Sequence, residues 1–508
     1  MVKNKSVTCV LGIDLGTSSL KCVVIDQAGQ VLATAEQNYP TQSPQPGWME
    51  QYPDAWVEAL RAALTELHTR EPHLLNSLAA IGICSAAHIP VLLDDHDRVI
   101  RPAILWSDQR SDVEVTEIKA NLSIRLEDTT LNEASCTWTL PQLLWVRRHE
   151  PDAFNRVRRL LSSKDYLVFR LTGTAQMDHG SAAATLMLDA RSKTWSAQIK
   201  ALSGLPENAF ASLVDPMTII GAVTAEAARG FALPLGVPVI AGALDSAAEL
   251  VGCGILAPGN GGMVRVGSAG GMMVVTNEPT FNPGIITYPH VVENFYYKQA
   301  GTNACGTSLK WLRQVGEMMR PSDAPPITYE NMDRLAAQAD PGANGLMFHP
   351  YLQGERAPYW NAELRGSFTG IAHTHGWPQF TRAVMEGVAF SLLDGLCMFR
   401  RDGLNITSAV MSGGVTKSEI WSQIITDVLG METRTIHQGD SAFGMCLIAA
   451  TAVGMFASID EAVAICVKDA RTLAPDMKNC DRYKRLFARY QETARFLDGL
   501  ARKYGTDI

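Results

Sequence analysis

A strand, a tight glycine turn and a second strand follow one another twice in this chain, and this repeat limits the folds open to it. The first copy joins residues 7–13 to residues 20–25 through Asp14-Leu-Gly-Thr-Ser-Ser19. The second joins residues 262–266 to residues 272–275 through Gly267-Ser-Ala-Gly-Gly271. Short apolar runs with β-branched residues, bounded by Gly and Ser, predict β-hairpins. One such hairpin in each half indicates an internal duplication.

The segments around these hairpins alternate between strand and helix patterns. Residues 53–67 have apolar side chains at helical spacing, and residues 237–243 form a buried-strand pattern followed by a small-residue helix over 246–252. This alternation predicts an α/β fold, and residues 481–503 predict a terminal surface helix. A chain of 508 residues is long enough for two large domains, which we place at residues 1–250 and 251–508.

Composition excludes several classes of protein. The net charge is −8 and no block of Lys and Arg occurs, so we expect no nucleic-acid partner. The ten cysteines are scattered without a C-x-x-C pair, and residues 1–10 lack the apolar core of a secretory signal, which indicates a cytoplasmic protein without a zinc site. Residues 441–459 carry no charge, but their Gly and Ser/Thr content favours a helix buried in the core over one in a membrane.

The common phosphate-binding motifs are missing from the sequence. It has no G-x-x-x-x-G-K-[ST] loop, and its Gly-rich stretch at 252–262 does not satisfy G-x-G-x-x-G, so any phosphate must be held by the amides of a β-turn. The first hairpin turn suits this role. Asp14 can hold a hydrated Mg²⁺, while Gly16, Thr17 and Ser18 offer amides and hydroxyls to a phosphate. A plain hairpin turn is the alternative for this string.

Two longer stretches resemble the FGGY family of carbohydrate kinases, within the actin-like ATPase superfamily. Gly12-Ile-Asp-Leu-Gly-Thr-Ser18 is similar to the family's first phosphate loop. Gly366-Ser-Phe-Thr-Gly-Ile371, together with Gln379-Phe-Thr-Arg-Ala-Val-Met-Glu-Gly387, fits its long C-terminal signature. Similar stretches run along nearly the whole chain, at 102–110, 163–181, 350–358 and 412–421. The resemblance implies two duplicated actin-like (ribonuclease H-like) domains with a central cleft, the sugar mainly on the N-terminal domain and MgATP mainly on the C-terminal one.

The resemblance also implies the catalytic group and a second phosphate loop. Asp245 aligns with the family's catalytic base, and a carboxylate at the end of a strand can accept the proton of a sugar hydroxyl. From the residues alone, the alternative for Asp245 is an N-cap of the helix that follows. Gly267 and Ser268 align with the second phosphate loop, where Ala269 lacks a hydroxyl that relatives usually carry.

The remaining candidates are implied for the nucleotide and the sugar. Gly413, Gly414 and Lys417 match the adenosine-binding loop, although a glycine pair often marks a simple turn. The residues implied for the sugar pocket are Ala87, His88, Trp106 and Asp108. Xylulokinases carry Gln-Met-His where this chain has Ala86-Ala87-His88, so we expect a pocket of altered shape; a structural role is the alternative for His88.

These residues predict an ATP-dependent carbohydrate kinase that uses Mg²⁺ and phosphorylates a hydroxyl of a ketopentose or polyol. Xylulokinases are the members with the greatest overall similarity; ribulose, a pentitol or glycerol are alternative substrates. Glycerol fits less well, because its kinases have Asp-Gln where this chain has Asp245-Ser246. A catalytically silent nucleotide-binding sensor is the alternative from another functional class. The sequence does not determine the oligomeric state; many relatives are dimers, and a homodimer is the assembly that the resemblance suggests.

Overall fold

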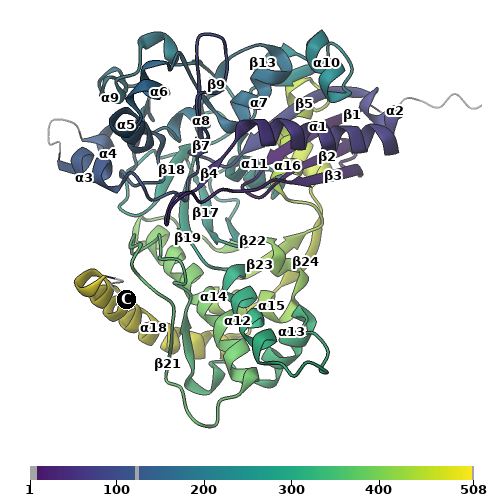
Figure 1. Ribbon diagram of the computed structural model, residues 1–508. Helices are drawn as coiled ribbons and strands as arrows, with labels where there is room; N and C mark the ends of the chain where they lie inside the picture. Colours follow the sequence, from purple (N-terminus) through teal and green to yellow (C-terminus); the bar gives the residue numbers. More distant parts are fainter. Residues whose placement is uncertain (1–7, 121–124, 506–508) are drawn as a thin grey trace, which may run out of the picture.

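Two mixed β-sheets, one in each half of the chain, form the framework of the protein. The computed structural model describes residues 8–120 and 125–505 (Figure 1), so Val7, the first residue of the predicted strand 7–13, lies outside the described residues. The first sheet has the order β13-β14-β5-β1-β2-β3 with β15 beside β5, and the second has the order β18-β19-β17-β16-β22-β23-β24. The strands of the first sheet are β1 (Cys9–Leu15), β2 (Ser19–Asp26), β3 (Val31–Asn38), β5 (Leu78–Ser85), β13 (Ile219–Ala222), β14 (Pro238–Ile240) and β15 (Ala243–Leu244). Those of the second are β16 (Gly262–Val266), β17 (Gly270–Thr276), β18 (Ile286–Pro289), β19 (Tyr296–Thr302), β22 (Ser408–Gly413), β23 (Glu432–Ile436) and β24 (Asp469–Leu473).

The two sheets repeat one topology. In the first, β1 pairs antiparallel with β2, β2 antiparallel with β3, and β1 parallel with β5. In the second, β16 pairs antiparallel with β17, β17 antiparallel with β19, and β16 parallel with β22. The outer strands β14 and β13 correspond in the same way to β23 and β24. The hairpins predicted from the two glycine turns are therefore the β1–β2 and β16–β17 hairpins of a duplicated α/β fold.

A helix from the second half of the sequence fills the core of the first sheet. This helix, α16 (Ser441–Ala452), lies among the strands of the first half in Figure 1, on the face opposite α1 (Pro53–Arg70). It approaches so closely that a Cβ on Gly12 of β1 would lie 2.1 Å from the carbonyl oxygen of Ala442. The uncharged run 441–459 thus contains a buried helix, as predicted. Among the described residues, no helix combines the length and the apolar character needed to cross a membrane.

The second sheet is covered on both faces. Alternate residues of its strands face opposite ways: Met263 and Val410 belong to the hydrophobic cluster of the first half, whereas Val264 and Met411 belong to that of the second. The first face receives α11 (Asp245–Gly252), whose Glu249 contacts Arg265 and Ser412. The helices α14 (Trp377–Arg401) and α15 (Glu419–Leu429) contact strands of the second sheet, and α12 (Gly306–Met319), α13 (Tyr329–Gln338) and the terminal α18 (Met477–Tyr504) pack against these helices. The predicted helix 481–503 is confirmed as the greater part of α18.

Shorter elements complete both halves. In the first half they are β4 (Glu50–Gln51), α2 (Pro72–Leu75), β6 (Pro90–Leu93), β7 (Ala103–Ile104), α3 (Asp112–Ala120), α4 (Leu126–Thr130), α5 (Thr139–His149), α6 (Pro151–Asn155), β8 (Arg159–Ser162), α7 (Ser163–Thr172), β9 (Gln176–Asp178), α8 (His179–Ala183), β10 (Leu188–Asp189), β11 (Thr194–Trp195), α9 (Ala197–Ser203), β12 (Ser212–Val214) and α10 (Ala225–Phe231). In the second half they are β20 (Met347–His349), β21 (Ser367–Thr369) and α17 (Ile459–Cys466).

One predicted strand is broken. The pattern at 237–243 gave a continuous strand, but the structure has β14 and β15 with Ala241-Gly242 between them. Gly242 has a φ of 81°, a conformation that strongly favours glycine. A Cβ there would lie 2.0 Å from the carbonyl oxygen of Ile83 on β5, so the glycine also permits close contact with the neighbouring strand. The apolar pattern could not reveal this kink, because the residues on both sides of it are buried.

Candidate active site

Three parallel strands of the first sheet end at one edge, and a candidate residue follows or closes each of them. In the register, Asp14 near the end of β1 lies beside Cys84 of β5, and Leu244 of β15 lies beside Ser85 of β5. Asp245 follows β15 directly. The carboxyl ends of parallel strands in open α/β sheets are where ligands bind. The fold therefore brings Asp14, Asp245 and the segment 86–88 to the same edge.

Buried charged groups hold the chain at the kink before Asp245. Lys164 is fully buried on α7, and its Nζ donates a hydrogen bond to the carbonyl oxygen of Ala241 at 2.9 Å. The same ammonium lies 2.5 Å from Asp165 and 2.8 Å from Asp178. Both carboxylates are also nearly inaccessible, and the two of them share the single positive charge of this ammonium. The buried Lys164 thus stabilises the backbone kink that places Asp245 at the edge of the sheet.

Asp245 is the first residue of α11 rather than its N-cap. The capping position belongs to Leu244, whose side chain makes no capping bond, so the alternative of a plain N-cap does not describe this residue. Its Oδ1 accepts a hydrogen bond from the backbone N–H of Ser246 at 2.7 Å. Its Oδ2 lies 3.5 Å from Nη1 of Arg265, and its side chain is 20% exposed. That accessible carboxylate edge is what a proton acceptor requires.

Negative charge exceeds positive charge around this residue. Asp245 and Asp440 lie close enough to raise the pKa of both Asp14 and Glu249, and Arg265 is the guanidinium among them. Burial, with Asp245 as the largest contributing charge, raises the pKa of Asp14 to about 7. Burial also raises the pKa of Glu249, which Arg265 opposes from 3.2 Å. Groups with such perturbed pKa values gather at functional sites.

The second sheet meets this cluster with its own carboxyl edge. Val266 of β16 lies beside Gly413 of β22, so the turns that begin at Gly267 and Gly414 leave the sheet at neighbouring positions. Arg265, one residue before the first of these turns, reaches across to Asp245 and Glu249. Ser412, one residue before Gly413, donates a hydrogen bond to Glu249 at 2.6 Å. The two edges therefore face each other across a cluster of charged groups.

Both turns of the second sheet present accessible backbone. Ser268, Gly413 and Gly414 are exposed, and Gly413 has a φ of 85°. A Cβ on Gly413 would lie 2.5 Å from the carbonyl oxygen of Val266, so a side chain is excluded there. Lys417 is exposed at the end of the short 3₁₀ turn η3 (Gly414–Lys417), and nothing in the described part of the chain holds its ammonium.

The first turn is fastened by side chains from both sides. The indole N–H of Trp106 donates to Oγ1 of Thr17 at 3.2 Å, and the Gln51 amide donates to the Thr17 carbonyl oxygen at 2.7 Å. The Tyr39 hydroxyl donates to the carbonyl oxygen of Gly16. Ser18 is exposed at the tip of the turn. These contacts fix the loop before any ligand arrives, which favours tight binding of a phosphate.

His88 is hydrogen-bonded through both ring nitrogens. Nδ1 lies 2.8 Å from the carbonyl oxygen of Ala184, to which it donates, so Nε2 accepts from the Tyr288 hydroxyl at 2.6 Å. Burial lowers the pKa of His88 to about 4, which keeps the ring neutral. The structural role that the sequence left open is thus present, and the bond to Tyr288 of β18 joins the two halves. Ala87 lines a small cavity directly beside this ring.

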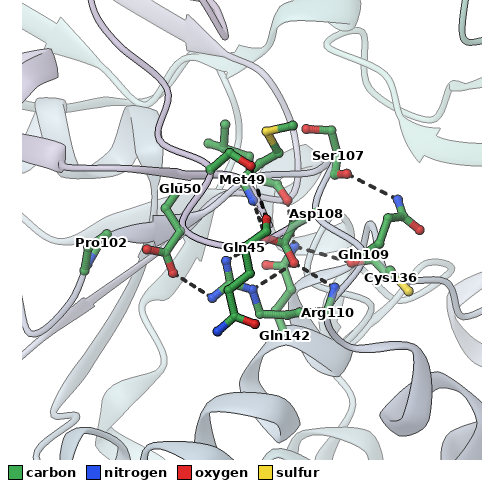
Figure 2. Close-up of polar contacts among 12 residues, drawn as sticks. Gln45, Met49, Glu50, Pro102, Ser107, Asp108, Gln109, Arg110, Cys136 and Gln142 are labelled. Carbon is green, nitrogen blue, oxygen red and sulfur yellow. Dashed lines mark hydrogen bonds and ion pairs between the residues drawn. The ribbon is translucent and has the colours of Figure 1, made fainter. Parts of the chain in front are cut away.

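Asp108 is placed differently from the other sugar-pocket candidates. It is 1% exposed, and Figure 2 shows both of its oxygens occupied by protein groups. Oδ1 accepts from the backbone N–H and from Nε of Arg110, both at 2.9 Å; Oδ2 accepts from the Met49 N–H at 2.6 Å and from Nη2 of Arg110 at 2.7 Å. Arg110 also pairs with Glu50 at 2.6 Å. In this arrangement Asp108 supports Trp106, two residues earlier, and no acceptor position is left for a sugar.

Four charged residues of the site were not among the candidates. Arg265 and Lys21 are cations inside otherwise apolar strand patterns, which is a signal that the sequence did offer. Asp440 caps α16 and binds Lys21, and Glu249 lies in the middle of α11. No local pattern marks the last two, since their roles depend on the packing of helices from both halves.

Comparison with known proteins identifies the family of this chain. Residues 9–252 match the N-terminal domain of the FGGY family of carbohydrate kinases, and residues 262–453 match its C-terminal domain. The chain belongs to this family. It is an ATP-dependent sugar kinase, and the predicted fold class and family are confirmed.

A xylulose kinase of Staphylococcus epidermidis is 32% identical, with 95% of each chain covered. One of Bacillus subtilis is also 32% identical, over 95% of this chain and 96% of the relative. The crystal structure of a xylulose kinase from Rhodospirillum rubrum superposes with a TM-score of 0.86 at 30% identity, covering 97% of this chain and 99% of that one.

Proposed function

We propose that this FGGY kinase transfers the γ-phosphoryl group of ATP to a hydroxyl of a ketopentose, with Asp245 as the general base. The observation that carries the proposal is the meeting of two sheet edges: Asp14 and Asp245 on one side, and the exposed glycine turns at Gly267 and Gly413 on the other. A base and phosphate-binding turns on opposite sides of one junction suit a sugar and a nucleotide that react between them.

In the proposed reaction, the Asp245 carboxylate accepts the proton of the acceptor hydroxyl as its oxygen attacks the γ-phosphorus. The new bond joins the sugar oxygen to phosphorus; the bond that breaks joins phosphorus to the β–γ bridging oxygen, and ADP leaves with that electron pair. Arg265 lies 3.5 Å from Oδ2 and helps to hold the carboxylate in position for the transfer. Phosphoryl transfer depends mainly on such positioning and on charge stabilisation.

Asp14 has the chemistry required to hold Mg²⁺. Burial raises the pKa of its carboxylate to about 7, and the neighbouring carboxylates of Asp245, Asp440 and Glu249 raise it as well. A divalent cation would relieve this repulsion, and Mg²⁺ is typically held by one or two carboxylates together with nucleotide phosphates. When bound, the metal would offset the charge of the β- and γ-phosphates. Gly16, Thr17 and Ser18 would offer amides and hydroxyls to the γ-phosphate.

For the nucleotide, we propose Gly267 and Ser268 as the second phosphate turn and Gly413-Gly414 as the platform for adenosine. The exposed backbone of these turns supports both roles. Lys417 is proposed as an accessory cation at the end of the same segment. Ala269 offers no hydroxyl, so the second turn would act mainly through its amides and Ser268.

For the sugar, the names of the relatives and the residues around His88 support a ketopentose such as D-xylulose. Trp106 offers an apolar ring next to the first phosphate turn, and Ala86 and Ala87 leave space beside His88. We therefore expect a substrate panel to separate D-xylulose from ribulose, pentitols and glycerol. A cytoplasmic location is supported by the ten cysteines, all of which are free. The homodimer stays a prediction.

The test combines a substrate panel with one matched pair of variants. Wild-type enzyme is assayed for ADP release with Mg²⁺, ATP and each sugar. Asp245→Asn and Asp245→Ala are expected to lower kcat by about 100-fold or more, the contribution typical of a general base, while ATP binding measured by calorimetry is retained. Asp323→Asn, an exposed residue outside the site, is the control. Near-normal turnover by the Asp245 variants, or a wild-type enzyme inactive on every sugar despite binding ATP, would refute the proposal; the second result would favour the sensor.

A further inference from the structure

One guanidinium at the junction of the two halves has no role in the scheme above. Arg356 follows Glu355 in the segment between β20 and β21. Its Nε donates to Oδ1 of Asn303 at 2.9 Å, and its Nη2 to the carbonyl oxygen of Thr302 at 3.3 Å. Its flat face rests on Gly301, where a Cβ would lie 2.7 Å from Cζ. Asn303, Thr302 and Gly301 therefore fix the orientation of the guanidinium.

Neighbouring residues link this guanidinium to both of the proposed phosphate turns. Gly301 and Thr302 pair with Gly271 and Gly270, the residues that leave the turn at Gly267–Ala269. On its other side, Cζ lies 5.6 Å from the centre of the Trp106 ring. Trp106 in turn donates its indole hydrogen bond to Thr17 in the first turn. Arg356 thus lies between the phosphate turns of the two halves, supported by a residue of each.

Arg356 is a partly buried cation without a close ion-pair partner among the described residues. Within residues 8–120 and 125–505, no carboxylate oxygen comes within 4.0 Å of its nitrogens, whereas Arg265 pairs with Asp245 and Glu249, and Lys21 with Asp440. The neighbouring Glu355 directs its oxygens to the Thr302 hydroxyl and to the backbone N–H groups of Asn303 and Arg356. Burial lowers the pKa of Arg356 from its ordinary value, and the charge of Glu355 opposes this shift in part. A partly buried cation without a close ion pair favours the binding of an anion.

We propose that Arg356 is a catalytic residue whose guanidinium contacts the oxygens of the phosphoryl group during its transfer from ATP to the sugar. The inference rests on the proposed function and adds a group to it. As the bond from phosphorus to the β–γ bridging oxygen breaks and the bond to the sugar oxygen forms, negative charge is spread over the three oxygens of the moving group. A guanidinium fixed between the two turns stabilises that charge without rearrangement.

The geometry also explains why an arginine serves here. A planar guanidinium can stack on Gly301 and under Trp106 while its edge stays free for two oxygens of one group. A lysine at this position has neither the flat face nor the paired donors. Arg356→Lys should therefore recover only part of the activity lost in Arg356→Ala.

The experiment compares wild type, Arg356→Ala, Arg356→Lys and the control Arg485→Ala, an exposed residue of α18. We expect Arg356→Ala to lower kcat by about 100-fold or more, with KM for ATP and for the neutral sugar changed by less than about threefold. Millimolar guanidinium chloride should restore part of its activity, and the melting temperature should stay close to that of wild type. Wild-type turnover on the sugar is measured first, so a failure of the proposed function is recognised independently of any variant.

A binding measurement separates transition-state contact from a structural role. ADP with Mg²⁺, sugar and fluoroaluminate mimics the transferring phosphoryl group. Arg356→Ala should lose affinity for this complex while binding ADP alone as wild type does. Equal loss for both, or a raised KM with unchanged kcat, would overturn the proposal. A defect confined to sugar acids would overturn it too, because Arg356 would then recognise a substrate carboxylate rather than the phosphoryl group.

Discussion

Asp108 shows that a residue at this site can contribute by holding its neighbours in position. The sequence suggested a sugar contact, but its carboxylate is enclosed by Arg110 and the Met49 amide. Arg110 lies 3.9 Å from the centre of the Trp48 ring and joins Asp108 to Glu50. The network holds the segment that carries Trp106, and Trp106 holds Thr17. We infer that Asp108 affects catalysis indirectly, by holding the segment that carries Trp106 in position.

Asp108→Asn should therefore affect stability more than sugar binding. The change removes one charge from a buried pair and leaves Arg110 with Glu50 alone, so the free energy of unfolding should fall by about 2 kcal/mol. Thermal unfolding would show this as a lower melting temperature, while KM for the sugar changes by less than about threefold. Asp95→Asn, an exposed turn residue, should change neither. An unchanged melting temperature with a tenfold higher KM would instead indicate direct contact with the sugar.

Among single residues, the sequence predicted those that follow the ends of strands. It missed those that reach the site only because distant segments of the chain pack together. Asp14 and Asp245 each stand where an apolar strand stops, and the resemblance to the FGGY family distinguished them from a turn residue and an N-cap. Asp440 reaches the site only because α16 docks on the first sheet and presents its N-terminus to Lys21. No pattern in one stretch of sequence contains that contact.

Among the elements, the crossing of α11 and α16 has the strictest geometry. A Cβ on Gly444 would lie 1.8 Å from the carbonyl oxygen of Ala248, which is backbone and cannot turn aside. Since α11 begins with Asp245, any separation of these helices also moves the proposed base. The crossing thus links core packing to catalysis.

Gly444→Ala should lower both stability and kcat. The helices must move apart, and overpacking of this kind costs about 3 kcal/mol. Gly499→Ala is the matched control: Gly499 lies within α18, and a Cβ there would meet nothing within 4 Å. That change should raise stability by about 0.5–1 kcal/mol, because alanine is the better helix former. Chemical denaturation of both variants, with kcat measured in parallel, checks the pair; equal stability of the two would contradict the close crossing.

The attachment of α18 to β20 should depend on pH. His349 is fully buried, stacks on Tyr490 of α18 with ring centres 4.4 Å apart, and donates from Nε2 to the Tyr490 carbonyl oxygen at 3.1 Å. Burial lowers its pKa to about 4, below the ordinary value of 6.5. Between these values the unfolded chain binds a proton that the folded one does not, so this contribution to stability is present above pH 6.5 and is lost as the pH falls toward 4.

His349→Gln removes that titration. At pH 7.5 the variant should be less stable than wild type by about 1–2 kcal/mol, because the stacked ring and its hydrogen bond are lost. The difference should narrow between pH 6.5 and 4, since only wild type loses stability through this group. Urea unfolding across this range, with the exposed His73→Gln as control, measures it. A difference that stays constant with pH would show that the pKa of His349 is not lowered.

Over the whole molecule, duplication could be predicted from the sequence, but the exchange of a helix between the halves could not. The two hairpins with glycine turns gave the repeat, and the matching strand orders of the two sheets bear it out. Residues 1–250 and 251–508 are a division along the chain. In space, α16 and α17 lie in the core of the first half, together with residues such as Val10, Ile81 and Leu250. Hydrophobicity marked α16 as buried without indicating which sheet it covers.

The exchange predicts that the first half cannot fold alone. A fragment of residues 1–250 would leave the face of β1 and β5 that receives α16 open to water, and that face is lined by Gly12 and Gly82, which are shaped for a helix. Exposed apolar surface of this extent leads to aggregation or to a loosely packed state. The fragment should therefore lack near-ultraviolet circular dichroism and a cooperative unfolding transition. Appending residues 437–468 through a flexible linker should restore both, whereas the same segment with Gly444→Ala should restore them less. Cooperative unfolding of the 1–250 fragment by itself would mean that the helix is an accessory to the first core, and the domain boundary would then coincide with the division along the chain.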